Sequence, residues 1–422
     1  MNWLSALLIS VMLLTPAACG APADEQGPSA REYALHYTIT PLPASSLATV
    51  SAHVSQSRHY LREMSFVMPS DSAAPEGDGE IQIVNGQVTW QVPQNGGRLE
   101  WTVKLANQRS NGAYDAWLND EWGIFRAEDV IPRARTRTLR DATSNTTLAF
   151  SLPPGWSFIS EYSRLEEPQR VSREGRRFAQ PTGWIAVGKL GVRHETIAGT
   201  RVAVAGPEGQ SVRRMDMLAL LNWTLPEAAT LLGNAPERLT IISADDPMWR
   251  GALSAPQSIF IHADRPLISE NATSTLVHEM MHVALAFDTA PNYDWIAEGF
   301  AEYYSLELLH RGNAITSRRY ARAINELREW GEAAGRLCRS TSTGPDTALA
   351  TTVLRTLDRE IRDSTQGKSS LDDVAAALST LEKAVDADAL RAIVEELTGG
   401  ETATLDMDNL PGCRSIAART AN

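Results

Sequence analysis

The stretch His278-Glu279-Met280-Met281-His282 decides how this 422-residue chain is interpreted. Its neighbours Leu276, Val277 and Val283 to Leu285 are apolar, which is typical of a helix in a protein core. On a helix, residues four apart share one face, so both imidazoles can reach one ion. Zinc accepts two histidines and one carboxylate and leaves one position open for water. Glu279 lies beside that position and can take the proton from a zinc-bound water.

A third ligand is expected from the segment Trp295 to Tyr304, which reads WIAEGFAEYY. The pattern predicts helices over about Ser269 to Phe287 and Trp295 to Leu309. Two antiparallel helices joined by a short turn can bring Glu298 opposite the histidine pair. Glu302 follows one turn later on the same face, where it either holds a ligand imidazole from behind or remains a solvated carboxylate.

The rest of the chain divides by pattern, and the expected fold class is α+β. Residues 31–190 are expected to form a β-sandwich-like domain, because apolar residues alternate there and Asn85-Gly86 marks a hairpin. Residues 191–312 mix strands with helices, and residues 313–422 are expected to form a helical domain. The tryptophans of the first part are expected to fill its core, and they are Trp117, Trp122, Trp156 and Trp184.

The first residues have the features of an export signal. An uncharged apolar run from Leu4 to Leu14 is followed by small residues and then by Cys19. We expect a signal peptide over residues 1–18, lipid attachment at Cys19, and a flexible tether over residues 19–30. Ordinary cleavage after Ala23 is the alternative. The protein is therefore expected to be exported to the periplasm and anchored in the outer membrane by its lipid.

The composition is that of a globular protein, with 43% hydrophobic and 21% charged residues. A net charge of -12 argues against nucleic acid as a partner, because nucleic acid favours a basic surface. The same charge leaves the N-terminal lipid as the only expected contact with a membrane. Cys338 and Cys413 would lie in an oxidising compartment, where a disulfide and two buried thiols are both compatible with the sequence.

The motif His278-Glu279-x-x-His282, followed by Glu298 within W-x-x-E-G-F-A, resembles that of the gluzincin metallopeptidases. The similarity is greatest to the glycyl-aminopeptidase family of exported bacterial enzymes and extends from about Asp115 to Leu397. It implies a thermolysin-like catalytic domain that hydrolyses peptide bonds in peptide or protein substrates. It also implies one zinc ion per chain, held by His278, His282 and Glu298, with Glu279 as the catalytic base. Weaker matching pieces are Pro154-Gly155-Trp156, Leu357 to Arg362 and Ser370 to Asp373.

One departure from the family pattern concerns the substrate. Such families carry an edge strand with a Gly-Gly-Leu-Glu-His or Gly-Ala-Met-Glu-Asn motif, where this chain has Gly251, Ala252, Leu253 and Ser254. These residues are expected to bind an extended peptide by strand addition, along a strand from Gly251 to Ile261. Ser254 replaces the Glu that would grip a free α-amine. Both an aminopeptidase and an endopeptidase are therefore retained as interpretations.

A second departure concerns the oxyanion. Related families place a Tyr in a Tyr-x-Lys-Gly motif where this chain has Thr347 to Ala350. Loss of such a hydrogen-bond donor typically costs about 100- to 1000-fold in rate. Tyr320 or His310 is a candidate substitute, although Tyr320 also suits a helix-face aromatic. The alternative function is a catalytically weakened, peptide-binding or scaffolding lipoprotein that retains the metallopeptidase fold. A carbohydrate-binding β-sandwich with an appended helical domain leaves the metal ligands unexplained.

Overall fold

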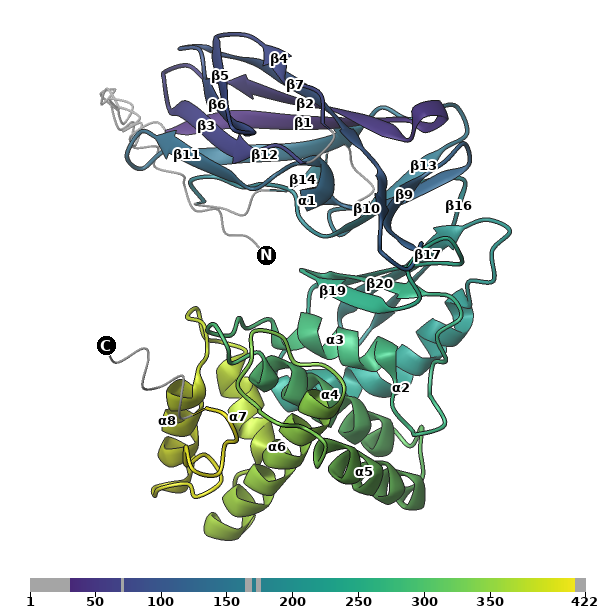
Figure 1. Ribbon diagram of the computed structural model, residues 1–422, viewed down its shortest axis with the longest axis vertical. Helices are drawn as coiled ribbons and strands as arrows, with labels where there is room; N and C mark the ends of the chain where they lie inside the picture. Colours follow the sequence, from purple (N-terminus) through teal and green to yellow (C-terminus); the bar gives the residue numbers. More distant parts are fainter. Residues whose placement is uncertain (1–30, 70–71, 164–168, 172–175, 414–422) are drawn as a thin grey trace, which may run out of the picture.

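The computed structural model describes residues 31–69, 72–163, 169–171 and 176–413 (Figure 1). The signal peptide, the lipidation at Cys19 and the tether were all predicted within residues 1–30, which lie outside this range. In the described part, no helix is both long enough and apolar enough to cross a membrane. Several sheets and a set of helices make the fold mixed α+β, so the predicted class is confirmed at that level.

Before Leu190, the described residues form three sheets. In β1, the alternating residues Tyr33, Leu35, Tyr37 and Ile39 are all buried, as their spacing predicts. The first sheet has the order β14 (Gln169–Arg170), β12 (Thr143–Phe150), β1 (Glu32–Leu42), β2 (Leu47–Ser55), β7 (Gly96–Lys104) and β4 (Glu76–Gly77). A 3-10 turn, η1 (Pro43–Ser45), joins β1 to β2.

The second sheet contains the hairpin that Asn85-Gly86 predicts. Its order is β11 (Ala134–Thr138), β3 (Leu61–Val67), β6 (Gln87–Gln91) and β5 (Glu80–Val84). Asn85 and Gly86 both have positive φ and connect β5 to β6, as a two-residue hairpin loop requires. The third sheet has the order β13 (Ser157–Ser160), β15 (Trp184–Gly188), β10 (Trp122–Arg126), β9 (Tyr114–Leu118) and β8 (Ala106–Gln108). The short helix α1 (Ala127–Val130) follows β10.

A fourth sheet lies between the N-terminal sheets and the helices (Figure 1). Its order is β16 (Leu190–Ile197), β17 (Thr200–Pro207), β18 (Arg238–Ala244), β20 (Ser258–His262) and β19 (Ala252–Ala255). Strands β17, β18 and β20 are parallel, and β19 runs antiparallel at the edge. One face packs on the third sheet through an apolar cluster that includes Trp184 and Phe260. The other face carries α2 (Arg214–Leu232) and α3 (Thr275–Leu285).

The remaining helices pack on α3 and on one another and complete one continuous hydrophobic core. They are α4 (Trp295–Arg311), α5 (Ser317–Gly331), α6 (Pro345–Ser364), α7 (Leu371–Leu378) and α8 (Ala387–Thr398). This core extends from Ile197 to Cys413, so residues 191–312 and 313–422 share it. Cys338 and Cys413 form a disulfide that ties the C-terminal segment to the loop before α6.

Two predicted elements were wrong in their limits. The metal-motif helix was expected from Ser269, but α3 begins at Thr275, because Ser274 caps it and Ser269 forms a turn with Thr273 instead. The single strand expected from Gly251 to Ile261 is a hairpin. Its turn at residues 256–257 separates β19 from β20, and only β19 presents an open edge.

Candidate metal centre

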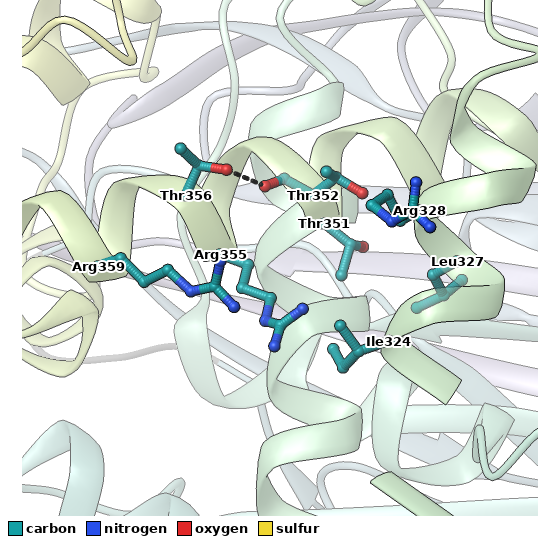
Figure 2. A pocket seen from close by; sticks show the side chains of 8 residues that line it. All are labelled: Ile324, Leu327, Arg328, Thr351, Thr352, Arg355, Thr356 and Arg359. Carbon is teal, nitrogen blue, oxygen red and sulfur yellow. Dashed lines mark hydrogen bonds between the residues drawn. The ribbon is translucent and has the colours of Figure 1, made fainter. Parts of the chain in front are cut away.

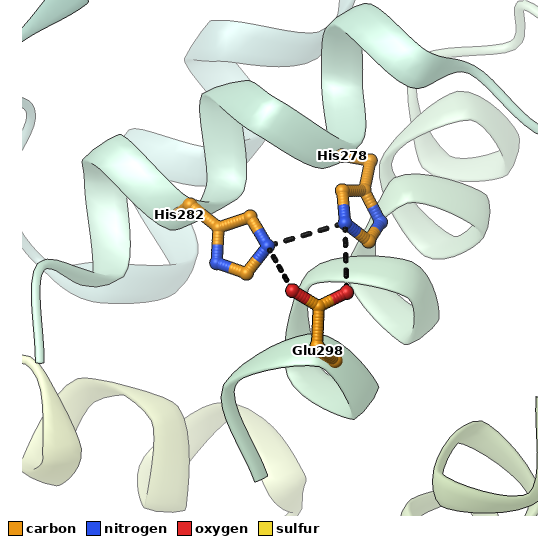
Figure 3. A group of neighbouring side chains, drawn as sticks. All are labelled: His278, His282 and Glu298. Carbon is orange, nitrogen blue, oxygen red and sulfur yellow. Dashed lines mark hydrogen bonds and ion pairs between the residues drawn. The ribbon is translucent and has the colours of Figure 1, made fainter. Parts of the chain in front are cut away.

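The N-terminal cap of α3 sets the orientation of the histidine pair. The hydroxyl of Ser274 accepts a hydrogen bond from the backbone N–H of Val277 at 3.2 Å, which satisfies one donor of the first turn. Most of the apolar side chains of this helix are buried in the core. His278 and His282 therefore share the face that remains, and this face is turned toward α4 (Figure 3).

Close packing of α6 holds the second helix in place. A Cβ added at Gly299 would lie 2.9 Å from the Cβ of Ala350, so α6 can approach α4 this closely only because residue 299 is a glycine. Trp295 and Phe300 are fully buried on the same helix. Glu298 is consequently fixed on the face that meets α3.

The three ligand candidates converge on one point (Figure 3). The Nε2 atoms of His278 and His282 are 3.1 Å apart. Each of these nitrogens lies 3.4 Å from one carboxylate oxygen of Glu298. Zinc bonds of about 2.0–2.1 Å in tetrahedral geometry imply ligand–ligand distances of about 3.3 Å. Among the described residues this is the one group of three or more donors close enough to hold an ion, and its spacing fits zinc.

Glu302 supports the first histidine from behind. Its Oε2 atom lies 3.0 Å from Nδ1 of His278, on the opposite side of the ring from Nε2. Both side chains are 15% exposed, so the contact is largely shielded from water. A carboxylate in this position fixes the tautomer that leaves Nε2 free to bind metal and makes that nitrogen more basic.

The charged groups of the site shift one another's pKa values. Burial disfavours the charged form of His278, but Glu298 and Glu302 outweigh burial and hold the pKa of His278 well above its ordinary value. Burial alone would raise the pKa of Glu298, yet hydrogen bonds from His278 and His282 lower it to about 2. The imidazole and the carboxylates of the site therefore stabilise each other's charged forms.

Glu279 is held against the edge strand of the fourth sheet. Its Oε2 atom accepts a hydrogen bond of 2.7 Å from the backbone N–H of Ser254 in β19, and the side chain is buried. The backbone N–H of His262 donates to the carbonyl of Gly251, so these residues form a hydrogen-bonded pair of the antiparallel ladder. Hydrogen-bonded pairs alternate with non-hydrogen-bonded pairs along β19. By this alternation, the backbone groups of Ala252 and Ser254 point to the open edge. The strand predicted to bind substrate and the predicted base are thus in direct contact.

Two further residues at the site were not identified from the sequence. Trp184, assigned only to core packing, also donates from Nε1 to the carbonyl of Leu253 at 2.8 Å and braces β19 from the β-rich side. Asp294, one turn before Glu298, accepts a hydrogen bond of 2.6 Å from the backbone N–H of Ser342. Burial, followed by repulsion from Glu298, raises the pKa of Asp294. Neither role has a local sequence signal, because both partners come from distant segments.

The two candidate oxyanion donors contact residues other than the metal ligands. His310 is twelve residues beyond Glu298 on the same helix, which separates them by about 18 Å at 1.5 Å per residue. Its ring stacks on Tyr320, and its Nε2 atom lies 3.0 Å from the hydroxyl of Ser317. The hydroxyl of Tyr320 donates to Glu307. Both residues stabilise the packing of α5 on α4.

Comparison with known proteins identifies the fold. No family model matches the chain, and no curated protein is similar to it in sequence. Among solved structures, an aminopeptidase N family protein from Idiomarina loihiensis matches with a TM-score of 0.63 and 16% identity, over 82% of this chain and 70% of that one.

An M1 zinc metallopeptidase from Deinococcus radiodurans matches with a TM-score of 0.57 and 14% identity, over 89% of this chain and 91% of the other. A mutant form of an M1 zinc metallopeptidase from this organism, bound to a Tyr-Ser-Ala substrate, gives a TM-score of 0.54 at 16% identity, over 87% and 90% of the two chains. The chain therefore has the fold of the M1 zinc metallopeptidases, a gluzincin-type peptidase fold.

Proposed function

We propose that this protein is a zinc-dependent peptidase of the gluzincin type, related to the glycyl-aminopeptidase family. The observation that carries the proposal is the arrangement of His278, His282 and Glu298 at the spacing of a zinc site. Glu279 lies on the same helix and contacts the strand β19. The similarity in fold to zinc metallopeptidases supports the same class of chemistry.

The ligands and the base have separate roles in this proposal. His278, His282 and Glu298 would hold the zinc, and Glu302 orients His278 through Nδ1. When bound, zinc supplies a Lewis acid that polarises the scissile carbonyl and makes water more acidic. Glu279 takes a proton from the attacking water as general base and returns it to the leaving amine as general acid. The hydrogen bond from Ser254 keeps this carboxylate turned toward β19, the strand on which the substrate would lie.

The substrate would be an extended peptide that pairs with β19 by strand addition. The outward-pointing backbone of Ala252 offers one donor and one acceptor for this pairing. Leu253 is 38% exposed, so it offers an apolar contact for a substrate side chain. Because Ser254 has no carboxylate to bind a free α-amine, we propose that the enzyme does not require a free N-terminus.

We also propose that the protein is exported and attached to the outer membrane through Cys19. The disulfide between Cys338 and Cys413 supports an oxidising location, because such bonds are rare where thiols are kept reduced. The apolar run from Leu4 to Leu14 supports the same proposal.

The proposal is tested by digesting a peptide library with the purified protein, with and without a metal chelator. Cleavage that disappears with the chelator and returns with added zinc is expected. A second digest compares peptides with free and acetylated N-termini, and we expect both to be cleaved. Zinc occupancy without any cleavage would contradict the peptidase and would leave a peptide-binding or scaffolding role.

A further inference from the structure

A second candidate site lies between α5 and α6, apart from the metal centre (Figure 2). Ile324 and Leu327 of α5 form one wall of a cavity of about 90 Å³. Arg355 and Arg359 of α6 form the other wall together with neighbouring threonines. Since about 10–15 Å³ of such space is enough to hold one water molecule, this cavity can hold several waters or a small ion.

Within the described part of the chain, neither Arg355 nor Arg359 has a hydrogen bond or an ion pair. They are four residues apart on one helix, so their like charges share a face and repel each other. Figure 2 shows both side chains extending from α6 along the same wall of the cavity. Two cations placed together without an anion form an arrangement that a bound anion would stabilise.

Two buried or half-buried carboxylates of this region, Asp358 and Glu307, already have partners. Asp358 receives a hydrogen bond from Arg362 and another from the backbone of Leu371. Glu307 is paired with Arg311 and accepts the hydroxyl of Tyr320. These two carboxylates therefore do not act as counter-ions to Arg355 and Arg359, although the whole chain has a net charge of -12.

The threonines of the cavity do not supply competing donors. The hydroxyls of Thr351, Thr352 and Thr356 each donate to a backbone carbonyl one turn earlier in α6. The cavity thus presents guanidinium donors and apolar side chains, with no acidic residue in its lining. This combination favours a compact oxyanion, whose several oxygens can be shared between two planar guanidinium groups.

The cavity opens on a face of α6 that is turned away from the metal ligands. Ala350 and Leu354 of α6 pack against Gly299 beside the metal centre, whereas Thr351 and Arg355 face α5. We propose that the cavity between α5 and α6 is a binding site for a phosphate-type dianion, held by Arg355 and Arg359. The site is independent of zinc and of peptide cleavage.

The test measures binding of inorganic phosphate and of sulfate to the full-length protein by calorimetry, at constant ionic strength. One saturable site per chain is expected. The double variant Arg355→Gln/Arg359→Gln should bind at least about tenfold more weakly, because both charge-assisted contacts are lost. Arg318→Gln is the matched control, since Arg318 is an exposed arginine of α5 outside the cavity, and it should bind like the wild type.

Thermal melting separates loss of binding from loss of fold. Without added anion, the double variant should melt at the wild-type temperature or above, because a repulsive pair has been removed. Sulfate should raise the melting temperature of the wild type and not that of the double variant. Absence of saturable binding to the wild type, or equal binding to the double variant, would overturn the proposal. Glycerol phosphate in place of inorganic phosphate distinguishes a phosphorylated organic ligand from the free ion.

Discussion

Replacing Glu302 with glutamine should weaken zinc binding without removing a ligand. In the wild type, Glu302 lies 3.0 Å from Nδ1 of His278 and is 15% exposed. Glutamine keeps the shape and one acceptor oxygen but loses the negative charge that makes the imidazole a stronger ligand. Loss of such a supporting group typically lowers metal affinity by about 10- to 100-fold. This corresponds to roughly 1.4–2.8 kcal/mol of binding free energy.

A competition titration against a chromophoric zinc chelator, at one fixed pH, measures this change. Glu307→Gln is the control, because Glu307 lies on the same helix with similar exposure but contacts Arg311 and Tyr320 instead of a ligand. Its zinc affinity should equal that of the wild type. If Glu302→Gln bound zinc as tightly as the wild type, or if the control lost as much affinity, the role assigned to Glu302 would be refuted.

Three other changes give further predictions. Glu279→Gln should retain zinc but lower the rate of peptide cleavage at least about 100-fold, measured with a fluorogenic peptide. In metal-free protein, the lowered pKa of Glu298 should contribute stability above pH 4.5 that is lost as the pH falls toward 2. Above pH 4.5, denaturant unfolding should therefore show the wild type to be more stable than Glu298→Gln by on the order of 3 kcal/mol. Replacing Cys338 and Cys413 by serine, which opens a link across 75 residues, should cost about 4 kcal/mol in the same assay.

Each of these predictions has an outcome that contradicts it. Undiminished cleavage by Glu279→Gln would remove this residue from the proton transfer. A stability difference between wild type and Glu298→Gln that persisted unchanged at pH 2 would show that the carboxylate charge is not its source. Equal unfolding of the oxidised protein and the serine variant would mean that the disulfide constrains little of the unfolded chain.

The parts of the fold that follow from local pattern could be predicted. Alternation in β1 and the turn at Asn85-Gly86 each depend on residues a few positions apart, and both predictions were confirmed. The spacing of His278 and His282 is equally local, because one helical turn brings them together. Predicting Glu298 as the third ligand required one further inference, that a short connection makes the two helices antiparallel.

Features that depend on distant segments could not be predicted. The close approach of Ala350 to Gly299 joins two helices that are far apart in sequence, and it fixes the position of Glu298. The hydrogen bond from Trp184 to β19 depends on how two sheets pack, which the period of a strand does not reveal. Tyr320 was proposed for the oxyanion on sequence proximity alone, and its actual partner, Glu307, occupies the distal half of α4.

The most direct test of the central claim is a measurement of zinc content in the purified protein and in His282→Ala. The account predicts about one zinc ion per wild-type chain, because three ligands converge at tetrahedral spacing. His282→Ala should contain almost none while remaining folded by circular dichroism. Absence of zinc from the wild type after incubation with the metal, or equal zinc in the variant, would contradict the assignment of His278, His282 and Glu298 as a metal site.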